Sequence, residues 1–268
     1  MLGLLVWVAC GATEPEEVSV LLRSAPAAPQ APPTPAASSC DAAAFPVALD
    51  IGHTPEAPGA TSARGRTEYA FNRDLATTLL TTLRSAGFTG SFLVDPDEGP
   101  LSLKERPARA VAGGAVVLLS LHHDSVQPHY LKNWQHSGGT GHYADDFSGF
   151  SLWVSLGAAT GPQNRALGEA LGTALTSAGH TPTLHHAEDV PGERRELLVA
   201  ELGLYRRDTL AVLRVSTIPT VLVEGGVIVH REEERRLEDP VWREGFSEAL
   251  VEGLRAFCST AAVSELAP

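Results

Sequence analysis

The sequence has few cysteines, little positive charge and no long apolar run, and each shortage excludes a class of protein. Three cysteines in 268 residues are too few for a disulfide-built scaffold and too scattered for a four-ligand zinc knot. The 20 Lys and Arg against 32 Asp and Glu give a net charge of −12, which argues against a nucleic-acid binder or a polybasic membrane-surface protein. Because 43% of the residues are hydrophobic, the chain can form a folded core. A globular enzyme or a binder of a neutral ligand remains.

The first residues resemble an export signal. Residues 1–9 (MLGLLVWVA) are nearly all apolar, but a membrane-spanning helix needs about 20 apolar residues. The sequence VACG at 8–11 resembles the end of a bacterial lipoprotein signal, in which the cysteine, here Cys10, is acylated after cleavage. Trp7 stands where that pattern prefers Leu, and a misassigned start codon is the alternative. We therefore predict an exported protein of the periplasm or cell envelope, with Cys10 as its candidate lipid tether.

An Ala/Pro-rich segment separates this signal from the remainder of the chain. Of the 21 residues at 24–44, 14 are Ala or Pro, a composition typical of an extended tether. The sequence therefore predicts a signal at 1–10, a tether at 11–44, one globular domain at 45–260 and a short tail at 261–268.

Apolar runs and helical periods alternate along the domain. The pattern predicts strands at 46–51, 91–94, 115–121, 150–156 and 219–224, and helices at 68–86, 102–112, 164–178 and 241–257. Since the strands are apolar on both faces, we expect an α/β fold with a mostly parallel central sheet and helices on both faces. The stretch at 123–146 follows neither period, and we expect a long insertion loop there.

Four polar residues follow the ends of these elements. His53 and His122 come at the ends of two strands, Glu68 opens the first helix, and Glu224 closes the strand PTVLVE. A wound sheet brings the carboxyl ends of its strands to one edge. Two histidines and a carboxylate are a standard catalytic zinc set, which leaves a fourth position for an activated water molecule. We therefore predict Zn²⁺ at His53, Glu68 and His122, and Glu224 as the general base.

Each residue alone has a structural explanation. A histidine at a strand end can be an ordinary polar terminus, and a glutamate at a helix start complements the helix dipole. Glu224 can mark the point at which its strand reaches water. The prediction of a catalytic site therefore depends on the joint occurrence of these residues at one edge of the sheet.

Several sequence blocks resemble the zinc-dependent N-acetylmuramoyl-L-alanine amidases. The resemblance lies in VALDIGH at 47–53, EYAFN at 68–72, LSLH at 119–122 and LAVLRVSTIPTVLVEGG at 210–226. It implies hydrolysis of the amide bond between N-acetylmuramic acid and L-alanine in peptidoglycan. It also implies zinc ligands at His53, Glu68 and His122, a catalytic Glu224, and Arg214 near the active site.

The chain departs from the family pattern after the second histidine. His123 and Asp124 stand where a small residue and Asn commonly follow, but adjacent strand residues point to opposite faces, so only one histidine can face a metal. The family resemblance selects His122.

Aromatic residues of the 123–146 insertion can form a sugar- or peptide-contacting wall or a packed surface loop: Tyr130, Trp134 and Tyr143. Other histidines give at most a weak signal for a second metal site: His129, His136, His142, His185 and His186.

Two of the cysteines flank the globular domain. Cys40 precedes the first strand and Cys258 ends the last helix, and an exported protein permits a disulfide between them. We therefore predict a bridge that ties together the two ends of the fold.

The sequence leaves two other functions open. One is a non-catalytic peptidoglycan-binding lipoprotein on an amidase fold, and the other is an enzyme for a different amide, because a zinc set does not specify its substrate. We expect a monomer that binds muropeptides and no nucleic acid. An activator protein and a membrane tether through Cys10 are further candidate partners.

Overall fold

The computed structural model describes residues 40–94, 101–136 and 139–260. The predicted signal at 1–10, the tether up to residue 39 and the tail at 261–268 lie outside these residues. Within the described residues, no helix combines the length and apolar character needed to cross a membrane. The described part begins with Cys40 and a short 3₁₀ helix, Ala42–Ala44, and Ala42 packs against the core. Cys40 and Ala42 therefore pack against the core just before the boundary predicted at residue 45.

The elements alternate as the sequence pattern predicts, with additional ones between them. The strands are β1 (Val47–Ile51), β2 (Phe92–Leu93), β3 (Val117–Asp124), β4 (Lys132–His136), β5 (Gly139–Tyr143), β6 (Ser151–Val154), β7 (Glu196–Val199), β8 (Leu204–Arg206) and β9 (Thr220–Val227). The helices are α1 (Glu68–Ser85), α2 (Glu105–Ala112), α3 (Gly161–Ser177), α4 (Ala211–Val215), α5 (Arg231–Glu238) and α6 (Pro240–Cys258).

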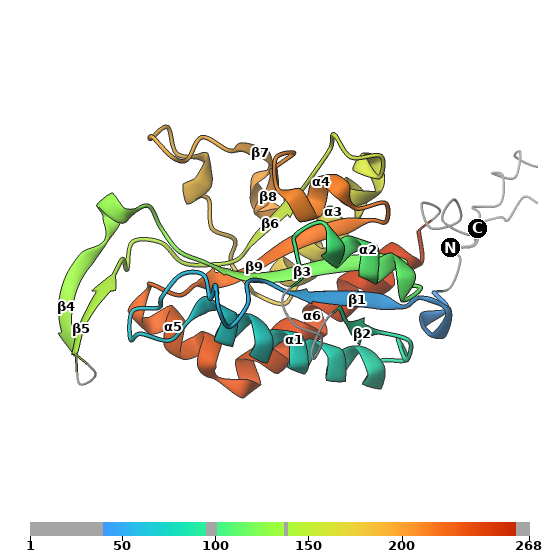
Figure 1. Ribbon diagram of the computed structural model, residues 1–268, viewed down its shortest axis with the longest axis horizontal. Coiled ribbons are helices and arrows are strands. Elements are labelled where there is room, and N and C mark those ends of the chain that lie inside the picture. The colour runs from blue at the N-terminus through green and yellow to red at the C-terminus, as the bar shows by residue number, and fades with distance from the viewer. Residues whose placement is uncertain (1–39, 95–100, 137–138, 261–268) are drawn as a thin grey trace, which may run out of the picture. The chain divides into compact units, whose positions relative to one another are not determined.

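A seven-stranded sheet in the order β2-β1-β3-β9-β6-β8-β7 organises the domain (Figure 1). The four strands from β2 to β9 are parallel, β6 is antiparallel to β9 and parallel to β8, and β7 is antiparallel to β8. Strands β4 and β5 form a separate antiparallel hairpin. The mostly parallel sheet expected from the sequence is confirmed, with antiparallel pairs on the β6–β7 side.

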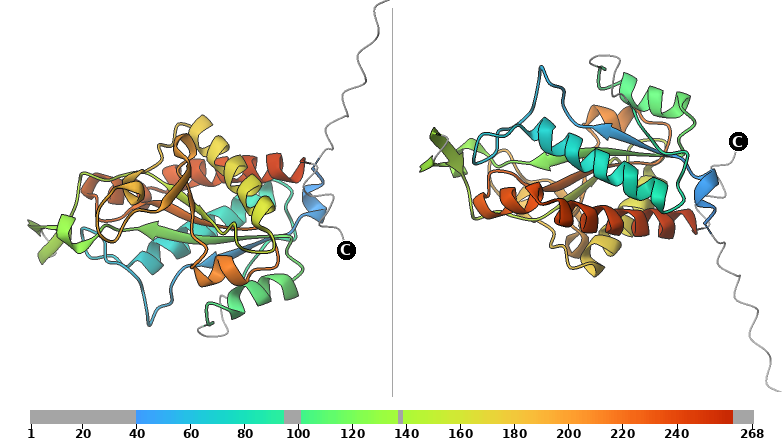
Figure 2. Two further views of the ribbon diagram at one scale, coloured as in Figure 1. Left: turned by 90° about the horizontal axis from the view of Figure 1, so that it is seen from above. Right: turned by 90° about the horizontal axis from the view of Figure 1, so that it is seen from below.

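Helices cover both faces of the sheet, because the central strands are apolar on both sides. Alternate residues of β1, such as Val47 and Leu49, pack with α1, α3 and α6, while the intervening Ala48 packs on the other face with α2 and α4. Figure 2 shows α3 and α6 on one side of the sheet and α2 and α4 on the other. The even-numbered residues of β3 and β9 therefore share the face of α2 and α4.

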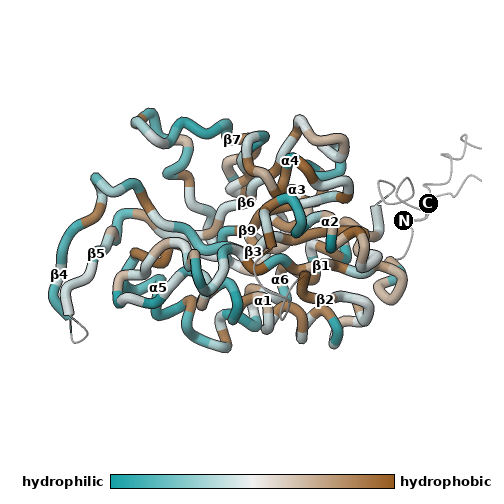
Figure 3. Tube along the Cα trace, viewed as in Figure 1, coloured by the Kyte–Doolittle hydropathy of each residue, from teal (hydrophilic) through white to brown (hydrophobic). Residues whose placement is uncertain are grey.

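The stretch at 123–146 differs from the predicted loop. Its first two residues extend β3, and the remainder includes a 3₁₀ turn and the hairpin β4–β5. The hairpin was missed because its strands are polar, as the hydrophilic colours of β4 and β5 in Figure 3 show. Strands β7 and β8 are the last two strands in the order of the sheet. They were missed because such short strands show little apolar periodicity.

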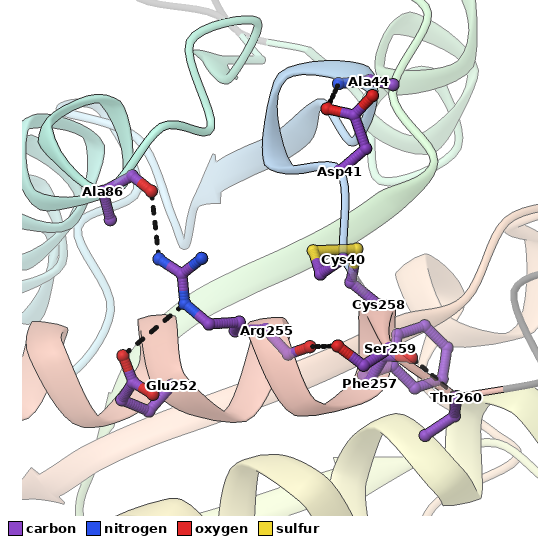
Figure 4. Close-up of a disulfide and its surroundings, with 10 residues drawn as sticks. All are labelled: Cys40, Asp41, Ala44, Ala86, Glu252, Arg255, Phe257, Cys258, Ser259 and Thr260. Atoms are coloured by element: carbon purple, nitrogen blue, oxygen red, sulfur yellow. Dashed lines mark hydrogen bonds and ion pairs between the residues drawn. A yellow bond between two sulfur atoms is a disulfide. The ribbon is translucent and has the colours of Figure 1, made fainter. Parts of the chain in front are cut away.

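A disulfide joins Cys40 to Cys258, as predicted, across a sequence separation of 218 residues (Figure 4). Arg255 of the same helix donates a hydrogen bond to the carbonyl of Ala86, just after α1. The bridge therefore ties the segment before β1 to the end of α6, at the point where the two ends of the fold meet.

We predict that the double variant Cys40→Ser/Cys258→Ser loses up to about 5 kcal/mol of unfolding free energy, because the bridge no longer restricts a long loop in the unfolded chain. Urea denaturation of the oxidised protein and of the variant measures this difference. Reduction of the wild-type protein before alkylation should add the mass of two alkyl groups. An unchanged alkylated mass would show that both thiols were free from the start.

Candidate active site

Three predicted ligands meet at the carboxyl ends of the central strands β1 and β3. His53 follows β1, His122 lies near the end of β3, and Glu68 is the first residue of α1. His53 Nε2 lies 3.0 Å from Glu68 Oε2, and His122 Nδ1 lies 2.9 Å from Glu68 Oε1. Their ligand atoms all lie within 4.8 Å of one another, so a single metal ion can contact all three.

Glycines make this close approach possible. A Cβ atom at Gly52 would collide with the His122 ring. Gly59 has φ +77°, and a side chain there would collide with the Glu68 carboxylate and meet the His53 ring. His53 itself has φ 68°, a conformation that residues other than glycine rarely adopt. The loop after β1 is therefore shaped to bring its histidine to the carboxylate.

The Glu68 carboxylate is buried and held from several sides. Its Oε2 accepts a hydrogen bond from the Ala60 backbone at 3.0 Å, and its Oε1 accepts one from Asn72 Nδ2 at 3.3 Å. Burial acts to raise the pKa of Glu68, but hydrogen bonds with His122 and His53 outweigh it and hold this pKa well below its usual range. The hydrogen bond to Glu68 also raises the pKa of His53. Without a metal, the cluster therefore favours an ionised carboxylate.

His123 points away from this cluster. Its side chain is buried beside α1, where Nδ1 lies 2.8 Å from Asn72 Oδ1 and the ring packs against Phe71. Burial lowers the pKa of His123 to about 3, so the ring is neutral near pH 7. The alternation of side chains along β3 thus places His122, and not His123, beside Glu68.

Glu224 lies directly beside His122. Strands β3 and β9 are paired so that His122 and Glu224 are partners, and both line one cavity of about 440 Å³ with His53. Glu224 is partly exposed, but its Oε2 atom is buried and makes no hydrogen bond among the described residues. Burial and the nearby carboxylates of Asp124 and Glu68 raise the pKa of Glu224 well above its usual value.

The comparisons with known proteins identify the family of this chain. The Amidase_3 family, N-acetylmuramoyl-L-alanine amidase, matches residues 47–256. The chain belongs to this family. Among curated proteins, no sequence is significantly similar to it. The match confirms the predicted family and with it a peptidoglycan amidase that acts outside the cytoplasm.

Solved amidase structures share the fold. Ami1 of Mycobacterium smegmatis is 19% identical with a TM-score of 0.61, and the match covers 80% of this chain and 96% of that one. An amidase of Clostridium difficile 630 is 20% identical, with a TM-score of 0.60 and coverages of 81% and 98%. The CwlD amidase of Clostridioides difficile, solved in complex with the GerS lipoprotein, is 16% identical, with a TM-score of 0.54 and coverages of 80% and 98%.

Other predicted residues of this amidase lie apart from the cluster. Arg214 is exposed on α4 and does not line the cavity shared by His53, His122 and Glu224. On the hairpin, Trp134 donates a hydrogen bond to the Ala63 carbonyl, and Arg231 lies over the rings of Trp134 and Tyr143. These aromatic rings therefore pack on the protein itself, as expected for a packed surface element.

Two residues that support the site carried no role in the sequence analysis. Asn72 is fully buried and contacts Glu68, His123 and the Gly52 carbonyl; its position four residues after Glu68 on one helix face was an available signal. Arg106 of α2 pairs with the buried Asp50 at 2.7 Å and donates hydrogen bonds to the carbonyls of Ile51 and His53. No local sequence motif predicts these contacts of Arg106.

We predict that Arg106→Met lowers the unfolding free energy by about 3–5 kcal/mol, because it leaves the Asp50 carboxylate buried without its charged partner. Arg73→Met is the matched control, since the Arg73 side chain is 57% exposed and its ion pair with Asp74 should contribute less than about 1 kcal/mol. Urea denaturation of both variants measures the difference. Equal losses in the two variants would contradict a structural role for the buried pair.

Proposed function

We propose that this enzyme hydrolyses the amide bond between N-acetylmuramic acid and L-alanine in peptidoglycan, with zinc at His53, Glu68 and His122 and with Glu224 as the general base. The observation that carries the proposal is the pairing of His122 with Glu224 on adjacent strands, inside a cavity that His53 also lines. This pairing supports a general base that acts next to the proposed metal site. The family supplies the reaction class.

The donor set fits zinc. Two imidazole nitrogens and a carboxylate oxygen are a common catalytic zinc set, and the backbone of Ala60 and the side chain of Asn72 already orient the carboxylate. A zinc ion held there would polarise the amide carbonyl and lower the pKa of a bound water molecule from about 15.7 towards 7.

Glu224 is suited to move protons. Its raised pKa allows the carboxyl group to hold a proton, and its Oε2 has no competing hydrogen bond among the described residues. In the proposed reaction, the carboxylate accepts a proton from the attacking water and delivers it to the nitrogen of the leaving L-alanine. The same residue then returns to its ionised state.

Two cavities share His53 and His122. One, of about 440 Å³, also contains Glu224. The other, of about 390 Å³, is lined by Leu103 just before α2, by Arg106 of α2 and by Ala211 of α4. An amide substrate carries one group on each side of the bond that is cut. We infer that these two cavities receive the two sides of the muramoyl–peptide bond.

The proposal extends to the cellular setting. Residues 1–10 would export the protein, Cys10 would carry the lipid, and the segment before Cys40 would act as a tether from the membrane to the wall. Arg214, carried over from the family resemblance, would approach the substrate from α4. The structure of CwlD in complex with the GerS lipoprotein supports a partner protein as a candidate activator of this chain.

We predict that His122→Ala removes about one zinc ion per chain, whereas His123→Gln removes none, because only the first side chain contacts Glu68. The metal content of protein that has been stripped with chelator, reloaded with zinc and desalted measures both. If His122→Ala kept the full zinc content of the wild type and His123→Gln lost one ion, the ligand would be His123.

We predict that Glu224→Gln keeps its zinc and lowers the rate of peptidoglycan solubilisation by about 10²–10⁴-fold, because the amide cannot accept the proton. Mass spectrometry of the digest should show free stem peptides and intact glycan strands with the wild-type enzyme. Near-normal turnover by Glu224→Gln would rule out this base. Binding of sacculi without peptide release by zinc-loaded wild type would instead indicate a non-catalytic wall-binding protein.

A further inference from the structure

A second group of metal-binding side chains lies at the same cavity. Asp124 is the last residue of β3, and His185 and His186 lie in a 3₁₀ turn, His185–Ala187. One ligand atom from each of the three lies within 4.8 Å of the others. Asp124 and His186 line the cavity that contains His53 and Glu224. The tertiary fold thus turns a histidine pair with a weak sequence signal into a complete cluster.

Both histidine rings are held so that their Nε2 atoms face Asp124. His185 Nδ1 lies 2.8 Å from Thr183 Oγ1, and His186 Nδ1 lies 2.9 Å from Glu193 Oε2. The two Nε2 atoms lie 3.5 Å and 2.6 Å from Asp124 Oδ2. Metal-binding histidines ordinarily donate their other ring nitrogen to an oxygen in this way. When each Nδ1–H does so here, each Nε2 presents its lone pair to the carboxylate, an arrangement that a cation would stabilise.

The Nε2 atom of His185 is the ring nitrogen of this cluster that lacks a hydrogen bond among the described residues. The residue is 4% exposed. A buried polar atom without a partner is costly and calls for an explanation. A proton shared between His186 and its two carboxylate neighbours would satisfy His186 but would leave His185 as it is. A cation at this point would satisfy both rings.

Neighbouring side chains hold the cluster in place. Gln127 donates a hydrogen bond to Glu193 Oε1 at 3.0 Å, and the Tyr205 hydroxyl donates one to the Thr183 carbonyl at 3.0 Å. The Trp153 ring packs edge-on against His186, with centroids 4.8 Å apart. The groups that orient the two histidines are thus themselves fixed by β6, β8 and the segment after β3.

We propose that Asp124, His185 and His186 bind a second divalent cation of the zinc class. Two imidazole nitrogens and one carboxylate oxygen suit Zn²⁺ and leave a fourth position. Ligand atoms of a tetrahedral zinc ion lie about 3.3 Å apart, so the 3.5 Å separation fits and the 2.6 Å contact would lengthen on binding. This site uses none of the three ligands proposed for catalysis and does not depend on their role.

Zinc stoichiometry of the full chain tests the proposal. Protein stripped with chelator, reloaded with excess zinc and desalted should contain two zinc ions per chain by elemental analysis. His185→Gln/His186→Gln should contain one, and His53→Ala should also contain one. His142→Ala, which removes an exposed histidine from the hairpin, is the matched control and should keep both. In cobalt-loaded protein, the double variant should lose only part of the visible absorption.

Glu193→Gln separates metal binding from a structural role of the cluster. It preserves the shape of the side chain but weakens the hydrogen bond between Glu193 and His186 Nδ1. The zinc affinity of the second site should therefore fall about 10–100-fold, while the affinity of the first site stays unchanged. This variant decides the question if the double histidine variant loses both ions through misfolding. Unchanged zinc titrations would overturn the proposal.

The two proposals can fail separately. A wild-type chain with one zinc ion that is lost only in His53→Ala would overturn the second site and leave the catalytic one intact. One zinc ion that is lost only in His185→Gln/His186→Gln would support the second site and overturn the first. If the wild-type chain binds two zinc ions and His185→Gln/His186→Gln still binds two, the second ion lies elsewhere, and this result would also overturn the proposed second site.

Discussion

The buried carboxylate of Glu68 is the group on which the rest of the site depends. It is the first residue of α1, and its two oxygens contact His53 after β1 and His122 on β3. A buried carboxylate is strongly unfavourable unless it is surrounded by partners. The loop after β1, the Asn72 amide and the ends of two strands must therefore all be in place around it. One side chain thus connects the start of a helix to the end of a sheet.

The sheet then decides which face each neighbouring group occupies. Because side chains alternate along a strand, His122 faces the cavity and His123 faces α1, although they are adjacent in sequence. The pairing of β3 with β9 places Glu224 beside His122 from a position about a hundred residues later. Arg106 of α2 also supports the site by donating a hydrogen bond to the carbonyl of His53. A polar cavity with a candidate base results from backbone pairing rather than from any local motif.

Much of the fold could be predicted because its signals are local. Apolar runs and a four-residue helical spacing identify the central strands and the helices α1, α3 and α6, and cysteines near the two domain ends predict the bridge of Cys40 and Cys258. The hairpin β4–β5 and strands β7 and β8 could not be found in this way. Their residues are polar or lie in short strands on one side of the sheet, where burial imposes no clear period.

The sequence by itself determined the α/β class, the family and the residues that could act as ligands, because these depend on residue type and short spacing. Only the tertiary structure decided which of these residues meet. It joined Asp124 to His185 and His186 across some 60 residues and left Arg214 exposed on α4. The physical reason is that metal and proton chemistry requires atoms within a few ångströms, and long-range packing sets those distances.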